Sequence, residues 1–383
     1  MSAFDALVGQ QRAVEVLDRA VRDAALSTPG PAMTHAWLFT GPPGSGRSVA
    51  ARAFAAALVC PDGGCGRCAD CHTAMVGTHP DVDNVTTEAM TISVETARTL
   101  VLEAAAAPSL ARWRVIVLED ADRLTEHANN ALLKSLEEPT PHTVWLLCAP
   151  SLEDVLPTIR SRCRHVVLAT PTAAAVAQHL VEHDGIDEPM AAFAARASMG
   201  HIGRARGLAH DESARLTRAA TLSVPTSVVT LGGALVAARD LVDAASERGA
   251  ERTKRVDDKE RIELARGMGV ENPDRPPQWA RAEFKRLKDQ QDKRRKRATI
   301  DELDRDLQDL LSYYRDVLVV QVGGEVTLVN AEMRAAIERI AEGSRPESTM
   351  RSMEAILEAR EKVMAYVTPQ LAVEEMVLAL RAG

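Results

Sequence analysis

Residues 41–48 read GPPGSGRS and carry the residue types that bind nucleotide phosphates. Gly41, Gly44 and Gly46 let backbone N–H groups converge on phosphate oxygens at the start of a helix, and the hydroxyl of Ser48 suits Mg²⁺. An apolar strand is predicted before this loop and a helix, SVAARAFAAALV, after it, which is the context that such a loop requires. The pattern predicts a site for ATP or ADP with Mg²⁺; the alternative is a loop that only holds the strand–helix turn.

Arg47 stands where this chemistry uses a lysine. A lysine ammonium is a compact point charge, whereas a guanidinium is larger and planar and has a fixed fork of donors. Arg47 can pair with a phosphate but does not fit the place of the lysine. We therefore expect weak nucleotide binding at most, and no efficient hydrolysis.

A pair of acids, Glu119 and Asp120, follows the apolar run VIVL. An NTPase of this layout uses an aspartate for Mg²⁺ and then a catalytic or water-positioning residue, here expected to be glutamate. The order in this chain is the reverse, so each carboxylate is displaced by about one methylene group, and a misplacement of ~1 Å at a reacting centre can cost about a hundredfold in rate. The alternative is a pair of solvated acids at the end of a strand.

Four cysteines occur within VCPDGGCGRCADCH, with the spacing C-x4-C-x2-C-x2-C. Four thiolates suit tetrahedral Zn²⁺, and a site with four protein ligands has a structural role. The predicted ligands are Cys60, Cys65, Cys68 and Cys71. His72 is a possible competitor, although four sulfurs already fill the site.

The bulk composition is that of a soluble globular protein of several domains. The 383 residues include 46% hydrophobic and 26% charged residues and have a net charge of −8, so contact with nucleic acid must be local. No apolar run is long enough for a membrane span, and the N-terminus does not resemble a signal peptide. We expect a cytoplasmic protein in which the remaining cysteines, Cys148 and Cys163, are buried thiols rather than disulfides.

The elements that position these residues alternate between strands and helices up to about residue 170. Continuously apolar runs predict strands at 35–40, 115–118, 144–148 and 166–168, as in a parallel sheet with helices on both faces. A small helical region is expected at 171–212 and a helical domain at 213–383, the latter with a charged insertion at about 245–300. The predicted fold class is therefore α/β followed by an all-α region.

The chain resembles the delta-prime family of subunits of the bacterial DNA polymerase III clamp loader, within the AAA+ superfamily. The resemblance is carried by FDALVGQQRAVEVL, GPPGSGRS, the four-cysteine insert, RVIVLEDADRLTEHANNALLKSLEEP and TIRSRC, and more loosely by DLLSYYRDVLVVQ and YVTPQLAVEEMVLAL. It implies an AAA+ domain at 1–170, a helical lid and a helical collar. The implied partners are gamma/tau and delta subunits, and through their complex the sliding clamp and primer–template DNA.

The resemblance also implies roles for individual residues. The position that senses the gamma-phosphate in active relatives falls at Ala149, and that of the lid arginine falls at Gly203, one residue before Arg204. The motif Ser161-Arg162-Cys163 is intact, and in this family its arginine reaches the ATP site of a neighbouring subunit. The expected function is thus a non-catalytic subunit that gives Arg162 in trans.

Two other hypotheses stay open. One is an active, gamma/tau-like ATP-hydrolysing motor, and the other is a zinc-stabilised nucleic-acid-binding module outside clamp loading. The basic run at 293–297 could bind DNA phosphates, although such a run is more often a solvated helix face.

Overall fold

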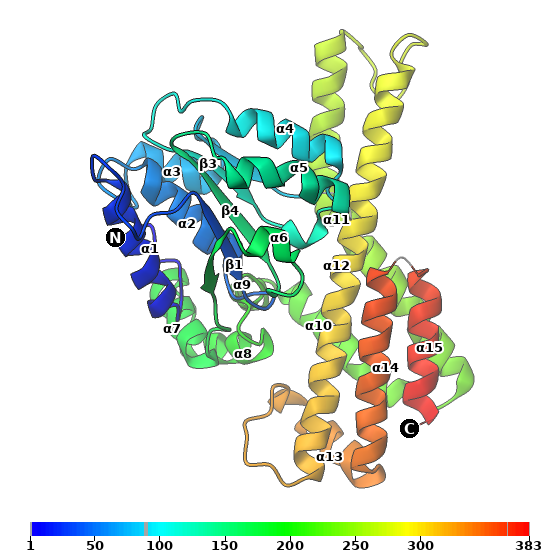
Figure 1. The fold of residues 1–383 in the computed structure, drawn as a ribbon. Coiled ribbons are helices and arrows are strands. Elements are labelled where there is room, and N and C mark those ends of the chain that lie inside the picture. The colour runs from blue at the N-terminus through cyan, green and yellow to red at the C-terminus, as the bar shows by residue number, and fades with distance from the viewer. Residues whose placement is uncertain (1, 88–90, 366, 383) are drawn as a thin grey trace. The chain divides into compact units, whose positions relative to one another are not determined.

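The computed structural model describes residues 2–87, 91–365 and 367–382, in two compact units that divide between His210 and Asp211 (Figure 1). The first unit is built on a five-stranded sheet of order β2-β3-β4-β1-β5 in which every neighbouring pair is parallel. Its strands are β1 (Ala36–Thr40), β2 (Val82–Val85), β3 (Arg114–Leu118), β4 (Thr143–Ala149) and β5 (Arg164–Val167).

Helices cover both faces of this sheet, because successive strand residues point to opposite sides. Trp37, Phe39 and Leu146 lie in one buried cluster with α1 (Gln11–Ala24) and α2 (Arg47–Val59). Their sequence neighbours Leu38 and Leu147 lie in a second cluster with α4 (Val94–Ala104) and α5 (Glu126–Glu137). Both faces of the sheet are thus buried under helices, which explains why the central strands are continuously apolar.

The remaining elements of the first unit are short. The described ones are α3 (Ala69–Val76), the 3-10 turn η1 (Ala121–Arg123), α6 (Pro157–Arg160), α7 (Ala173–Asp184), α8 (Glu188–Ala197) and α9 (Ile202–His210). The last three follow the sheet in sequence and pack on one another.

Among its described residues, the second unit contains helices and no strand. It contains α10 (Glu212–Ser227), α11 (Leu231–Met268), α12 (Arg281–Gln321), η2 (Ala331–Met333), α13 (Arg334–Gly343), α14 (Pro346–Met364) and α15 (Pro369–Ala382). Arg218, only 4% exposed, donates to Asp309 (3.2 Å) and Glu332 (2.5 Å), and so ties α10 to α12 and to η2.

The predicted fold class, a parallel sheet with helices on both faces followed by a helical region, is confirmed by this topology. The four predicted strands are present with shifted ends: β5 begins at Arg164 and ends before Leu168. Strand β2 was not predicted. Among the described residues, no helix combines the length and apolarity that crossing a membrane requires.

Candidate functional site

The phosphate loop connects β1 to α2, as the sequence predicts. Gly46 caps α2 at φ 90°, so that Arg47 and Ser48 are the first two residues of the helix. Gly44 has φ 87°, and a Cβ atom on it would lie 2.6 Å from the Cβ of His201. Only glycine fits here, and the segment that leads into α9 therefore rests directly on the loop.

Gln10 also fixes this loop, through hydrogen bonds of its side chain. The sequence analysis gave this residue no role. Its Nε2 donates to the carbonyls of Ser45 (3.2 Å) and Ala169 (2.6 Å), and its Oε1 accepts from the N–H of Ala169 (3.1 Å). The side chain is 5% exposed. One buried amide thus joins the phosphate loop to the connection between β5 and α7.

The charge of Arg47 acts on the acids that follow β3. Its Nη1 is buried and has no hydrogen-bond partner among the described residues, and the same is true of Ser45 Oγ. Burial raises the pKa of Asp122, and the charges of Asp120 and Asp154 raise it further, while Arg47 opposes them. A guanidinium therefore sits in the field of a carboxylate, Asp122, that the sequence analysis did not single out.

Both predicted acids are held by arginines of their own chain. Glu119 accepts from Nε of Arg52 at 2.7 Å and pairs with the Nη2 of the same residue. The Glu119 side chain is 14% exposed. Asp120 faces Nε of Arg123 at 3.5 Å and accepts from the N–H of Thr87 at 3.3 Å. These contacts occupy carboxylate oxygens that a magnesium ion and an attacking water would need.

Two further positions that the resemblance assigns to the nucleotide site lack hydrogen-bonding side chains. Ala149 ends β4 in register with Thr40, the residue before the phosphate loop, and is fully buried. Its methyl group can contact a nucleotide but cannot hydrogen-bond to a phosphate. Gly203 is the second residue of α9 and has no side chain, while Arg204 follows it on the same helix.

Arg162 lies between α6 and β5, away from the phosphate loop in sequence. Its Nη1 donates to the carbonyl of Thr158 (2.6 Å) and to Oγ of Ser161 (3.2 Å), and its Nη2 pairs with Glu137, the last residue of α5. The side chain is still 35% exposed.

The neighbours of Arg162 have different surroundings. Burial raises the pKa of the Cys163 thiol to about 12, and the side chain packs against the core around α4 and α5, so its role is in packing. Arg164 donates to the carbonyl of Ala32 (2.7 Å) and stacks over Trp37 (5.2 Å), which makes it a structural residue. These structural contacts distinguish Arg164 from Arg162, whose side chain is partly exposed.

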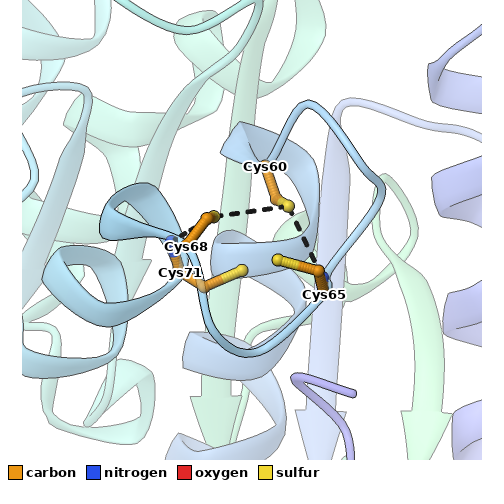
Figure 2. Close-up of side chains that lie close together, drawn as sticks. All are labelled: Cys60, Cys65, Cys68 and Cys71. Carbon is orange, nitrogen blue, oxygen red and sulfur yellow. Dashed lines mark hydrogen bonds between the residues drawn. The ribbon is translucent and has the colours of Figure 1, made fainter. Parts of the chain in front are cut away.

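The four predicted cysteines converge, three of them from the loop between α2 and α3 and Cys71 from the first turn of α3 (Figure 2). Their sulfur atoms all lie within 4.8 Å of one another, and Cys60 and Cys68 are 3.6 Å apart. Sulfurs on a tetrahedron with Zn–S bonds of ~2.3 Å lie about 3.8 Å apart, so the four thiols could hold a metal ion. Backbone N–H groups already point at two of the sulfurs, from Cys65 to Cys60 (3.5 Å) and from Cys71 to Cys68 (3.3 Å).

Comparisons with known proteins agree with this layout. Residues 10–172 match the family described as "DNA polymerase III, delta subunit". The Pseudomonas aeruginosa DNA polymerase III subunit delta' is 40% identical over 147 residues, which are 37% of this chain and 45% of that protein. The Mycobacterium tuberculosis subunit gamma/tau is 32% identical over 193 residues, or 48% of this chain and 32% of that protein.

The similarity to a third relative extends along most of the chain. The chain spans less than half the length of the Pseudomonas and Mycobacterium relatives. The Bacillus subtilis DNA polymerase III subunit delta', in contrast, is 26% identical over 354 residues, which are 92% of each chain. Together with the family match over residues 10–172, this similarity relates the chain to the delta' subunits of DNA polymerase III.

Proposed function

We propose that this chain is a non-hydrolysing clamp-loader subunit that donates Arg162 to the ATP site of a neighbouring subunit. The observation that carries the proposal is the contrast between two sets of side chains. Glu119 and Asp120 face arginines of their own chain, whereas Arg162 stands partly exposed on a surface loop. The chain would thus contribute to ATP hydrolysis without an efficient site of its own.

The ion pair with Glu137 is weak enough to be exchanged for a phosphate. The side chains of Arg162 and Glu137 are 35% and 47% exposed, and exposed pairs contribute only about 0–1 kcal/mol. An arginine delivered in trans to a transferring phosphoryl group is worth about 10³–10⁵ in rate, or roughly 4–7 kcal/mol. The stabilisation gained at the neighbouring subunit's phosphate therefore exceeds the free energy lost when the Arg162–Glu137 pair breaks. Before the subunits associate, the pair with Glu137 holds the Arg162 guanidinium in position.

The phosphate loop has a structural role in this proposal. Gln10 and His201 hold it against the connection to α7 and the start of α9. ATP or ADP with Mg²⁺ could still bind there, with Ser48 as the expected ligand of the metal ion, but Glu119 would have to leave Arg52 to serve it. The four cysteines would hold a structural Zn²⁺ that fixes the loop between α2 and α3. Gamma/tau and delta subunits, the sliding clamp and primer–template DNA are the proposed partners of the assembly.

The test is ATP turnover by the assembly reconstituted with its gamma/tau and delta subunits. Arg162→Ala is expected to lower turnover at least tenfold, while the assembly still elutes as one complex. Arg160→Ala is the matched control, because it removes a neighbouring arginine, the last residue of α6, and should leave turnover unchanged. Full turnover by an intact Arg162→Ala assembly would contradict the proposed role.

The active-motor hypothesis has its own test on the isolated chain. We expect no magnesium-dependent ATP turnover by the purified protein. Turnover that Ser48→Ala abolishes would instead favour a gamma/tau-like motor.

A further inference from the structure

The charged insertion folds into a two-helix arm, formed by the distal parts of α11 and α12 and by the tip between them. Arg360, near the end of α14, pairs with Asp304 at 2.7 Å, and Arg248 pairs with Asp306. Beyond these contacts α12 continues back to Arg281 and α11 forward to Met268. At 1.5 Å per residue, these parts are about 30–35 Å long. Residues 251–297 are called the arm below (Figure 1).

The arm is held together by close backbone approach and by ion pairs. A Cβ on Gly249 at its base would lie 2.7 Å from the backbone nitrogen of Thr299, so the two helices touch there. Farther out, Arg294 donates to Asp257 (2.7 Å) and Glu260 (2.7 Å), and its side chain is only 12% exposed. A small apolar cluster closes the tip; its members are Ala265, Met268, Val270, Ala280 and Phe284.

These contacts change the interpretation of the basic run at 293–297. Arg294 pairs across the arm and Arg297 pairs with Asp301 (3.2 Å). Both side chains are less than 15% exposed. Arg294 therefore joins the two helices and Arg297 pairs along α12, so neither side chain belongs to a free surface for a partner.

Asp257 and Glu260 of α11 are used in these pairs across the arm, and along the arm as a whole basic residues outnumber acidic ones. The arm carries sixteen Lys and Arg against ten Asp and Glu, in a chain whose net charge is −8. Among the described residues, no ion pair involves Arg281, Lys285 or Lys288, and all three are exposed. Their spacing of four and three residues places them on one face of α12, about 6 and 4.5 Å apart along its axis.

The same three cations border a groove of about 470 Å³ near the tip of the arm. Its apolar lining includes Pro276, Phe284 and Leu287. Trp279, two residues before Arg281, is 64% exposed. Three cations on one helix face, with an exposed indole two residues before the first of them, fit a strand of phosphates with unpaired bases, because phosphates need evenly spaced positive charge and every base can stack on an aromatic face.

We propose that the tip of the arm binds single-stranded DNA, with Arg281, Lys285 and Lys288 on the phosphates and Trp279 stacked on a base. This surface is independent of the arginine donation proposed above, because it lies on the helical unit and uses none of the residues around the phosphate loop. An acidic protein surface would match the cations, but it would make no special use of the exposed indole.

The experiment measures the fluorescence anisotropy of a labelled oligothymidylate of about 15 nucleotides, titrated with the full chain at about 50 mM salt. Saturable binding is expected, with a dissociation constant below about 100 µM. The triple variant Arg281→Gln/Lys285→Gln/Lys288→Gln should bind at least tenfold more weakly, and its salt dependence should lose a slope of about 2. Trp279→Ala should lower affinity about five- to hundredfold.

A second triple variant controls for net charge. Lys254→Gln/Lys259→Gln/Arg334→Gln removes the same three charges from side chains that pair with acids of their own helices, at 3.8, 3.7 and 3.2 Å. It should bind the oligonucleotide within twofold of the unaltered chain. Circular dichroism on every variant checks that the helices remain.

Three results would overturn the proposal. The first is the absence of saturable binding by the unaltered chain, which would leave an acidic protein surface as the partner of these cations. The second is an equal loss in both triple variants, since binding would then follow net charge alone. The third is equal affinity for a duplex of the same length together with no effect of Trp279→Ala, because the single-strand assignment depends on the indole.

Discussion

At the scale of single residues, the decisive feature of the predicted nucleotide site is that arginines of the same chain already pair with its two carboxylates. Glu119 is 14% exposed and is held by two nitrogens of Arg52, so its removal from this pair would leave a partly buried cation without a partner. Arg52 lies one helical turn after Ser48, on the helix that the phosphate loop begins. The reversed order of Glu119 and Asp120 is therefore accompanied by a cation, Arg52, that neutralises Glu119.

Replacing Arg47 by lysine should not restore hydrolysis. Arg47→Lys returns the compact cation, but Glu119 still pairs with Arg52, and Ala149 still offers no hydrogen bond to a phosphate. We expect magnesium-dependent ATP turnover by the isolated variant to stay at the level of the double variant Arg47→Lys/Ser48→Ala, which serves as its control. A rate well above that control would show that Arg47 alone disables the site.

Local patterns in the sequence identified the parts of this site but not their pairings. The loop at 41–48, the acids at 119–120 and the four cysteines each lie within a short segment, and each segment has a recognisable spacing. Arg52 and Glu119 are 67 positions apart, and Gln10 and Ala169 are 159 apart. The sequence of an alanine-rich helix does not indicate that one of its arginines, Arg52, contacts the acid at the end of a strand. Such contacts can be identified only from the fold, which brings the two segments together.

At the scale of elements, the accuracy of the strand predictions follows burial. The strands β1, β3 and β4 lie inside the sheet and are buried on both faces, which makes their sequences continuously apolar. Strand β2 is at the edge and reads VDNV, and its last three residues are only partly buried. An edge strand needs apolar residues on few positions, and four residues with two polar side chains carry no pattern that separates them from a loop.

The four-cysteine loop should carry a metal that stabilises the first unit. The purified, reduced chain is expected to contain close to one zinc ion, and a chelator should lower the midpoint of thermal unfolding of that unit by several degrees, since metal binding here contributes to folding. Cys65→Ser should lose the metal and show the same destabilisation without a chelator. Metal content by mass spectrometry and scanning calorimetry measure both effects.

His72 provides the matched control for the metal prediction. It is exposed and directly follows Cys71, so it is the nearest alternative ligand. His72→Ala should keep its full metal content, because four sulfurs already lie within 4.8 Å of one another. Reduced, unchelated protein without metal would refute the zinc site, and loss of metal in His72→Ala would show that the ligand set is wrong.

At the scale of the whole molecule, the chain is two units with separate cores. The first has the two clusters on the faces of its sheet, and the second packs its helices around side chains such as Leu307 and Val317, both fully buried. The boundary lies between α9 and α10. Because each unit buries its own apolar side chains and pairs its own buried charges, such as Arg218 with Asp309, we expect them to unfold in separate transitions.

The fragment 211–383 should therefore fold alone. We expect a helical circular dichroism spectrum and one cooperative thermal transition, at a midpoint within a few degrees of one of the two transitions of the full chain. Leu307→Ala should identify that transition, since emptying a fully buried leucine site costs about 2–5 kcal/mol and should lower the midpoint in the fragment and in the full chain alike. Leu132→Ala, fully buried beside the sheet, should move only the other transition. A fragment that unfolds without cooperativity, or a Leu307→Ala chain in which both transitions shift together, would mean that the helical unit depends on the first unit for its stability.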